Sequence, residues 1–213
     1  LRSALVERGI TMSGTIDTAR VAADAGLTSV FEMRSPPLTT VLAQMMKPSQ
    51  NQVAELLFKT IGRERGGAGT ADSARLVVER QLLAWGADSA GFAVRDGSGM
   101  SRHDYVTPET IVRILEAMRG HANFNDWYAA LPIAGVDGTI GSRMRNTAAQ
   151  GNVHAKTGTV DKARSLSGYV TTADGRMLEF SFLCNNFTVA NRDVERVQDA
   201  ILVMLAERPR PVK

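Results

Sequence analysis

Residues 154–159 read His-Ala-Lys-Thr-Gly-Thr, at the start of three stretches that read as β-strands. Lys156 supplies a point charge that suits a carboxylate or a phosphate. Thr157 and Thr159 add two hydroxyl groups, and Gly158 lets a ligand lie close to the strand backbone. The stretch therefore predicts an anion-binding strand edge, although the tripeptide Lys-Thr-Gly alone is common by chance.

The segments around this stretch predict an antiparallel meander. Strands are expected over 153–159, 165–172 and 177–184. Residues 173–176, Ala-Asp-Gly-Arg, join the last two strands, because Asp-Gly favours the positive φ values of a tight hairpin. A helix with one apolar face follows over 192–206. Since helices precede the meander, we expect an α+β fold in which the C-terminal helix packs on an antiparallel sheet beside a helical cluster.

Upstream, the apolar residues recur at helical spacing. They predict helices over 38–46 and 53–61, and Gly62 is expected to end the second. Pro48 separates the two helices. Residues 49–51, Ser-Gln-Asn, therefore lie at a corner where polar side chains project from neither apolar face. Further helices are expected over 71–85 and 107–118.

Composition excludes several classes of protein. The 213 residues are 44% hydrophobic and 22% charged, which is typical of a soluble globular protein, and no apolar run is long enough to span a membrane. The net charge of +3 without a basic block argues against a nucleic-acid partner. A single cysteine, Cys184, excludes an internal disulfide and a cysteine-based zinc site. The histidines His103, His121 and His154 show no metal spacing, so we expect no metal and no cofactor.

Three ordered blocks carry a family resemblance. They are residues 47–57 (Lys-Pro-Ser-Gln-Asn-Gln-Val-Ala-Glu-Leu-Leu), 96–102 (Asp-Gly-Ser-Gly-Met-Ser-Arg) and 154–159. With S-x-N at Ser49 and Asn51 ahead of K-T-G at Lys156, the chain resembles the penicillin-binding protein and serine β-lactamase superfamily. More narrowly, it resembles the class C low-molecular-mass penicillin-binding proteins, which are D-alanyl-D-alanine carboxypeptidases/endopeptidases of the peptidase S13 type. The resemblance implies a penicillin-binding-protein-like domain.

This resemblance also implies a chemistry. It is that of a serine-type D-Ala-D-Ala carboxypeptidase/endopeptidase, which acts on peptidoglycan stem peptides through an acyl-enzyme and is inhibited by β-lactam antibiotics. Ser49 would relay a proton toward the leaving amine. Asn51 would bind the substrate amide and orient a lysine that lies upstream. Lys156 would set the electric field around Ser49.

The same strand would bind the substrate. Thr157 and Thr159 would help to bind the terminal carboxylate, and Gly158 lies between them. The backbone N–H of Thr159 would form half of the oxyanion hole. Residues 96–99 are, on physical grounds, a turn, and the resemblance implies only a fixed loop near the site.

One family feature is missing from these residues. The nucleophile of the superfamily is the serine of S-x-x-K, and no serine here has a lysine three residues on. In the family that motif lies upstream of inserted accessory domains. We therefore expect residues 1–30 to be the tail of an inserted domain and residues 31–213 to be the C-terminal part of the transpeptidase-like domain. An upstream part of the same protein would carry S-x-x-K, and the present chain alone would be inactive. The resemblance also implies a periplasmic or exported protein.

Near the expected boundary, residues 28–33 read as a strand that a pair of prolines closes.

Alternatives to the catalytic interpretation stay open. Ser49 could simply cap a helix, and Lys156 could be an ordinary exposed strand lysine. The whole protein could be a peptidoglycan-binding remnant without chemistry, or a β-lactamase or esterase of the same fold.

Overall fold

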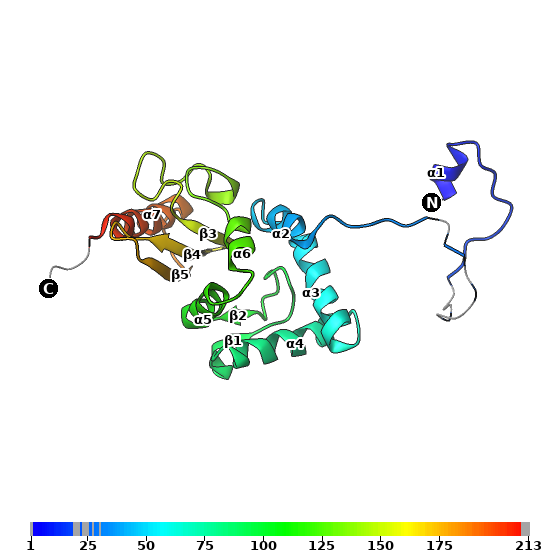
Figure 1. Ribbon diagram of the computed structural model, residues 1–213, viewed down its shortest axis with the longest axis horizontal. Coiled ribbons are helices and arrows are strands. Elements are labelled where there is room, and N and C mark those ends of the chain that lie inside the picture. Colours follow the sequence, from blue (N-terminus) through cyan, green and yellow to red (C-terminus); the bar gives the residue numbers. More distant parts are fainter. Residues whose placement is uncertain (1, 19–21, 23–25, 27, 30, 210–213) are drawn as a thin grey trace. The chain divides into compact units, whose positions relative to one another are not determined.

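The computed structural model describes residues 2–18, 22, 26, 28–29 and 31–209 (Figure 1). The chain forms two compact units, Leu1–Ser35 and Pro36–Lys213. The first unit contains the short helix α1 (Arg2–Val6). The second contains the sheet, the other helices and every residue singled out above for chemistry. The assignment of residues 1–30 to an inserted domain stays a prediction.

The strand expected over 28–33 is wrong for the described residues of that stretch. Residues 28, 29 and 31–33 form no strand, and Val30 lies outside the described residues. Phe31 and Met33 are exposed. A strand needs a neighbour to satisfy its backbone N–H and C=O groups, and alternating side chains alone do not supply one.

The predicted meander is confirmed as a three-stranded antiparallel sheet in the order β3-β4-β5 (Figure 1). Its strands are β3 (His154–Val160), β4 (Ala163–Thr171) and β5 (Met177–Asn185). The hairpin between β4 and β5 closes where the Thr172 N–H donates to the Arg176 carbonyl at 2.8 Å. Gly175 in this turn has a φ of +82°, as the Asp-Gly pair predicts.

Both faces of this sheet are covered. The predicted terminal helix, α7 (Asn191–Glu207), packs on one face, where Leu202 joins Leu166 and Val170 of β4 in a buried cluster. Tyr169 of β4 points to the opposite face and packs among residues of the helical cluster. Because side chains alternate along a strand, this arrangement fixes which residues of β3 face the helices.

The helical cluster comprises α2 (Leu38–Met46), α3 (Asn51–Gly66), α4 (Ala71–Ala84), α5 (Pro108–Arg119) and α6 (Phe124–Ala130). The strands β1 (Phe92–Ala93) and β2 (Tyr105–Val106) pair antiparallel beside it. Thr107 caps α5 as expected, because its side chain accepts a hydrogen bond from the Thr110 N–H. Within the described ranges, no helix combines the length and apolar character that a membrane crossing requires.

The end predicted for α3 is wrong. The helix runs through Gly62 to Gly66, and Gly67, with φ +81°, ends it in the left-handed conformation. Gly62 is needed for packing. A Cβ there would lie 2.8 Å from both the Ala68 carbonyl oxygen and the Ala74 nitrogen. This glycine therefore lets α4 and its preceding loop approach the C-terminal half of α3.

Candidate active site

Ser49 lies in the turn between α2 and α3, which we call the serine corner (residues 47–51). Its φ is +61°, a left-handed conformation that costs a residue with a Cβ about 1–2 kcal/mol. The Gln50 N–H donates to the Met45 carbonyl at 2.9 Å, which closes the end of α2. Helices that end this way usually have glycine at the left-handed position. A strained serine in its place is typical of a functional site.

Lys156 on β3 reaches the serine corner. Its Nζ donates to the Ser49 Oγ at 2.7 Å and to the Thr157 carbonyl oxygen at 2.7 Å. The fold thus joins two side chains that are 107 residues apart. Neither alternative drawn from sequence, a simple helix cap or an exposed strand lysine, accounts for this contact.

The electrostatics of the pair follow from burial. Burial lowers the pKa of Lys156 from 10.5 to about 8, so the ammonium still predominates at neutral pH. An ammonium has only donors, so the Ser49 oxygen accepts in this bond. The hydroxyl hydrogen of Ser49 is then free to be donated to another group.

The outer edge of β3 presents backbone amides. The Ala155 N–H points away from β4 and donates to the Pro132 carbonyl at 2.9 Å. Amides alternate sides along a strand, so the N–H groups of Thr157 and Thr159 face the same outer edge. The Thr157 hydroxyl donates to the Thr139 Oγ1 at 2.8 Å. Nothing in the sequence singled out Thr139.

A cleft of about 920 Å³ lies between β3, the serine corner and the loop that contains residues 96–100. Asn51, the first residue of α3, is exposed and lines this cleft. The cleft brings together all six predicted site residues: Ser49, Asn51, Lys156, Thr157, Gly158 and Thr159.

The loop at residues 96–100 forms a turn, as its residues predict, and hydrogen bonds fix it beside the cleft, as the resemblance implies. The Glu55 carboxylate on α3 accepts from the Gly97 N–H at 3.1 Å and the Ser98 N–H at 3.0 Å. Asp96 accepts from the Gly99 N–H at 2.6 Å. A Cβ on Gly97 would lie 2.5 Å from the Cβ of Phe58, so only glycine lets the loop approach α3 this closely. Sequence reasoning missed the role of Glu55, since its partners are backbone amides.

His154 shares its face of the sheet with Lys156, as the strand period predicts. It is nearly buried, its ring stacks on Tyr128 at a centroid distance of 3.8 Å, and its Nδ1 lies 3.1 Å from the Tyr128 carbonyl oxygen. Burial lowers the pKa of His154. The residue therefore packs between the sheet and α6.

Comparison with known proteins agrees with this geometry. The model of the D-Ala-D-Ala carboxypeptidase 3 (S13) family matches residues 1–208. The chain belongs to this family. Among S13 relatives, it is 41% identical over 210 residues to the D-alanyl-D-alanine carboxypeptidase of Actinomadura sp. (strain R39). That match covers 96% of this chain and 38% of the relative. Carboxypeptidase DacB of Mycolicibacterium smegmatis is 34% identical over 167 residues, covering 76% and 36%.

The fold is that of the penicillin-binding proteins. The crystal structure of penicillin binding protein 4 from Haemophilus influenzae, complexed with a novel β-lactam, is similar to this S13 chain with a TM-score of 0.67 and 32% identity. The similarity covers 74% of this chain and 37% of that one. The chain therefore spans a little over a third of the length of each of these relatives.

Proposed function

We propose that this chain forms one side of the active site of a serine-type D-Ala-D-Ala carboxypeptidase/endopeptidase. The enzyme acts on peptidoglycan stem peptides that end in D-Ala-D-Ala, through an acyl-enzyme, and β-lactam antibiotics inhibit it. The 2.7 Å contact between Lys156 Nζ and Ser49 Oγ carries the proposal, because it joins the S-x-N and K-T-G motifs of an S13 family member.

The mechanism is acyl transfer. A serine of S-x-x-K, in an upstream part of the same protein, attacks the carbonyl carbon between the two D-alanines, and the lysine of that motif takes the proton of the serine hydroxyl. The Thr159 N–H, on the outer edge of β3, donates to the oxygen on which negative charge develops. As the C–N bond breaks, Ser49 gives its hydroxyl hydrogen to the leaving amine and takes a proton from the Lys156 ammonium. Water then hydrolyses the acyl-enzyme and releases the shortened peptide.

The other predicted residues bind the substrate. Thr157 and Thr159 present hydroxyl groups beside the Lys156 charge, where they suit the terminal carboxylate. Gly158 lets the peptide lie close to β3. Asn51 projects from the start of α3, where its amide reaches the substrate backbone and the upstream lysine.

The same proposal includes the domain assignment of the chain, its activity in isolation and the location of the enzyme. Residues 1–30 are the tail of an inserted accessory domain, and residues 31–213 complete the transpeptidase-like domain. Without the upstream part the chain is inactive. The enzyme works in the periplasm or outside the cell, where peptidoglycan is accessible.

Covalent labelling tests the proposal. The product of the complete reading frame, incubated with fluorescent penicillin, is expected to become labelled, and residues 1–213 alone are not. Lys156→Met should slow labelling, whereas Lys162→Met, at the exposed turn between β3 and β4, should not. A complete protein that stays unlabelled would defeat the proposal.

A second candidate is a peptidoglycan-binding protein without catalysis. This alternative stays open because no serine among these residues has a lysine three residues on. The reading frame upstream separates the two candidates, because the enzyme requires S-x-x-K there and the binding protein does not. If labelling occurs, turnover of a D-Ala-D-Ala peptide faster than of β-lactam or ester substrates distinguishes the carboxypeptidase from a β-lactamase or esterase of the same fold.

A further inference from the structure

One segment outside the three motifs touches both sides of the cleft. It runs from Leu131 at the end of α6 to Arg143, and we call it the frame segment (residues 131–143). Its sequence, rich in glycine and without helical or strand period, pointed to no function. In the structure it connects the serine corner, β3 and α7.

The frame segment is anchored to the serine corner through Lys47. The Lys47 Nζ donates to the Asp137 carboxylate at 2.7 Å and to the Leu131 carbonyl at 3.0 Å. The other oxygen of Asp137 accepts from the Ile133 N–H at 3.0 Å. Because Lys47 stands two residues before Ser49, this ion pair fixes the frame segment beside the proposed proton relay.

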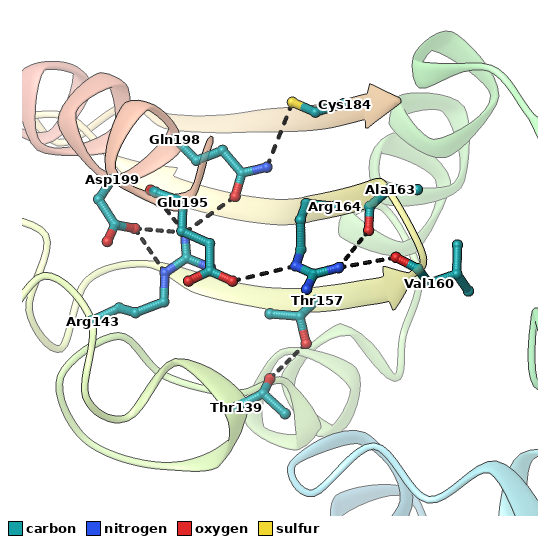
Figure 2. A network of polar contacts seen from close by, with 10 residues as sticks. All are labelled: Thr139, Arg143, Thr157, Val160, Ala163, Arg164, Cys184, Glu195, Gln198 and Asp199. Carbon is teal, nitrogen blue, oxygen red and sulfur yellow. Dashed lines mark hydrogen bonds and ion pairs between the residues drawn. The ribbon is translucent and has the colours of Figure 1, made fainter. Parts of the chain in front are cut away.

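Its other end is anchored to α7 (Figure 2). The Arg143 guanidinium contacts Asp199 at 2.6 and 2.9 Å, the Gln198 side-chain oxygen at 3.2 Å and the Glu195 carbonyl at 3.3 Å. The Arg143 side chain is 13% exposed, so the pair is well shielded from solvent. Both ends of the segment are therefore held, which restricts the movement of the residues between them.

Thr139, between the two anchors, contacts both sides of the cleft. Its backbone N–H donates to the Lys47 carbonyl at 3.1 Å, and its Oγ1 accepts from the Thr157 hydroxyl at 2.8 Å (Figure 2). Gly138 makes this approach feasible, since a Cβ there would lie 2.9 Å from the Lys47 carbonyl oxygen. Thr139 itself is exposed and lines the cleft.

We propose that Thr139 is a positioning residue for substrate binding: its hydroxyl holds the Thr157 side chain in the rotamer from which the Thr157 hydroxyl reaches the substrate carboxylate. This inference rests on the proposed function. A threonine hydroxyl rotates freely unless a partner fixes it, and both oxygens can donate as well as accept. Because each hydroxyl carries one hydrogen, Thr157 must turn its hydrogen from Thr139 to the carboxylate when the ligand binds, and the Thr139 hydroxyl then donates to the Thr157 oxygen. Without the Thr139 hydroxyl, the ligand itself must order the Thr157 side chain. The affinity for the ligand then falls, whereas the rate of the chemical step does not change.

The experiment measures acylation of the complete protein by fluorescent penicillin over a range of concentrations. This separates the dissociation constant of the initial complex from the acylation rate constant. Thr139→Val, which keeps the shape and the backbone N–H, is expected to raise the dissociation constant roughly three- to tenfold, the worth of one hydrogen bond. Its acylation rate constant should change less than about twofold. The Thr139→Ser variant, which keeps the hydroxyl group, should bind penicillin as tightly as the unaltered protein does.

Two controls make the result decisive. Thr60→Val, on an exposed face of α3 where the hydroxyl bonds its own helix at the Leu56 carbonyl, should change neither constant. Thr157→Val should weaken binding too, and adding Thr139→Val to it should cost nothing more, because the two hydroxyls act as a unit. Additive losses, unchanged binding in Thr139→Val, or an equal loss in Thr139→Ser would each overturn the role of Thr139. An unaltered protein that fails to label would instead defeat the proposed acyl transfer.

Discussion

The two sides of the cleft are built in different ways. The serine corner depends on local backbone geometry, with Ser49 in a conformation that a glycine would adopt more easily. On the other side, Lys156 and Thr157 stand on a strand whose register against β4 is fixed along its whole length. The serine corner places one hydroxyl group at a cost in stability, because its backbone is strained. The strand places its groups through close backbone packing, without such strain.

Removing the hydroxyl at the corner should have the largest effect. Ser49→Ala in the complete protein is expected to slow penicillin acylation by about 10²–10⁴-fold, because the proposed proton relay is lost. Stopped-flow or gel-based labelling measures the rate. Ser13→Ala, an exposed serine of the first unit, is the matched control and should leave the rate unchanged. Acylation by Ser49→Ala at the unaltered rate would remove the serine corner from the mechanism.

On the strand side, an added methyl group should be the largest disturbance. In Gly168→Ala the new Cβ would overlap the His154 carbonyl oxygen and lie 2.6 Å from the Ala155 Cα, where backbone must move. We expect a loss of about 3 kcal/mol in stability, seen as a lower Tm. Gly158→Ala is the control, since its Cβ would meet the Ser165 hydroxyl, which can rotate away. Equal melting temperatures for the two variants would show that backbone packing does not govern the strand.

The pH dependence of acylation tests how the two sides act together, because Lys156 on the strand must donate a proton to Ser49 at the corner. With its pKa at about 8, the ammonium is present below that pH and lost above it. Acylation should therefore fall by about tenfold per pH unit at alkaline pH, with a midpoint near 8. In Lys156→Arg the guanidinium cannot give up its proton, so acylation should be slow and the decline near pH 8 should disappear. A rate that stays flat between pH 7 and 10 would exclude Lys156 as the proton source.

The smallest expected effect is a difference in stability that reports the backbone strain at Ser49. Ser49→Gly should be as inactive as Ser49→Ala, but it should be more stable by about 1 kcal/mol, because glycine adopts positive φ without a steric cost. Thermal melts of the two variants measure the difference. If Ser49→Gly melts at or below the temperature of Ser49→Ala, the left-handed serine stores no strain.

Much of the second unit could be predicted from sequence. Periodicity and turn residues predicted α2, α5, the meander and α7, because each is encoded by residues close together in the chain. The motif residues Ser49 and Lys156 were chosen by their type and order, and the structure brings them into contact. Their chemical roles stay predictions.

What sequence reasoning missed has a common physical cause. The sequence predicts a helix end at Gly62, yet this glycine serves packing, and its partners, Ala68 and Ala74, lie on another segment. Glu55 and Thr139 were missed because they bind backbone groups or a hydroxyl far away in the chain. Such partners leave no local pattern, and only the fold brings them together.

The anchor of Arg143 on α7 has a consequence for biosynthesis. During translation, Ser49 and Lys156 leave the ribosome well before Asp199, the partner of Arg143. Until then the segment that bridges the two sides of the cleft lacks one of its two anchors. Domains generally fold as units during and after synthesis. The cleft is therefore completed late, when α7 docks, and a nascent chain truncated before α7 would carry Ser49, Asn51 and Lys156 without an assembled site.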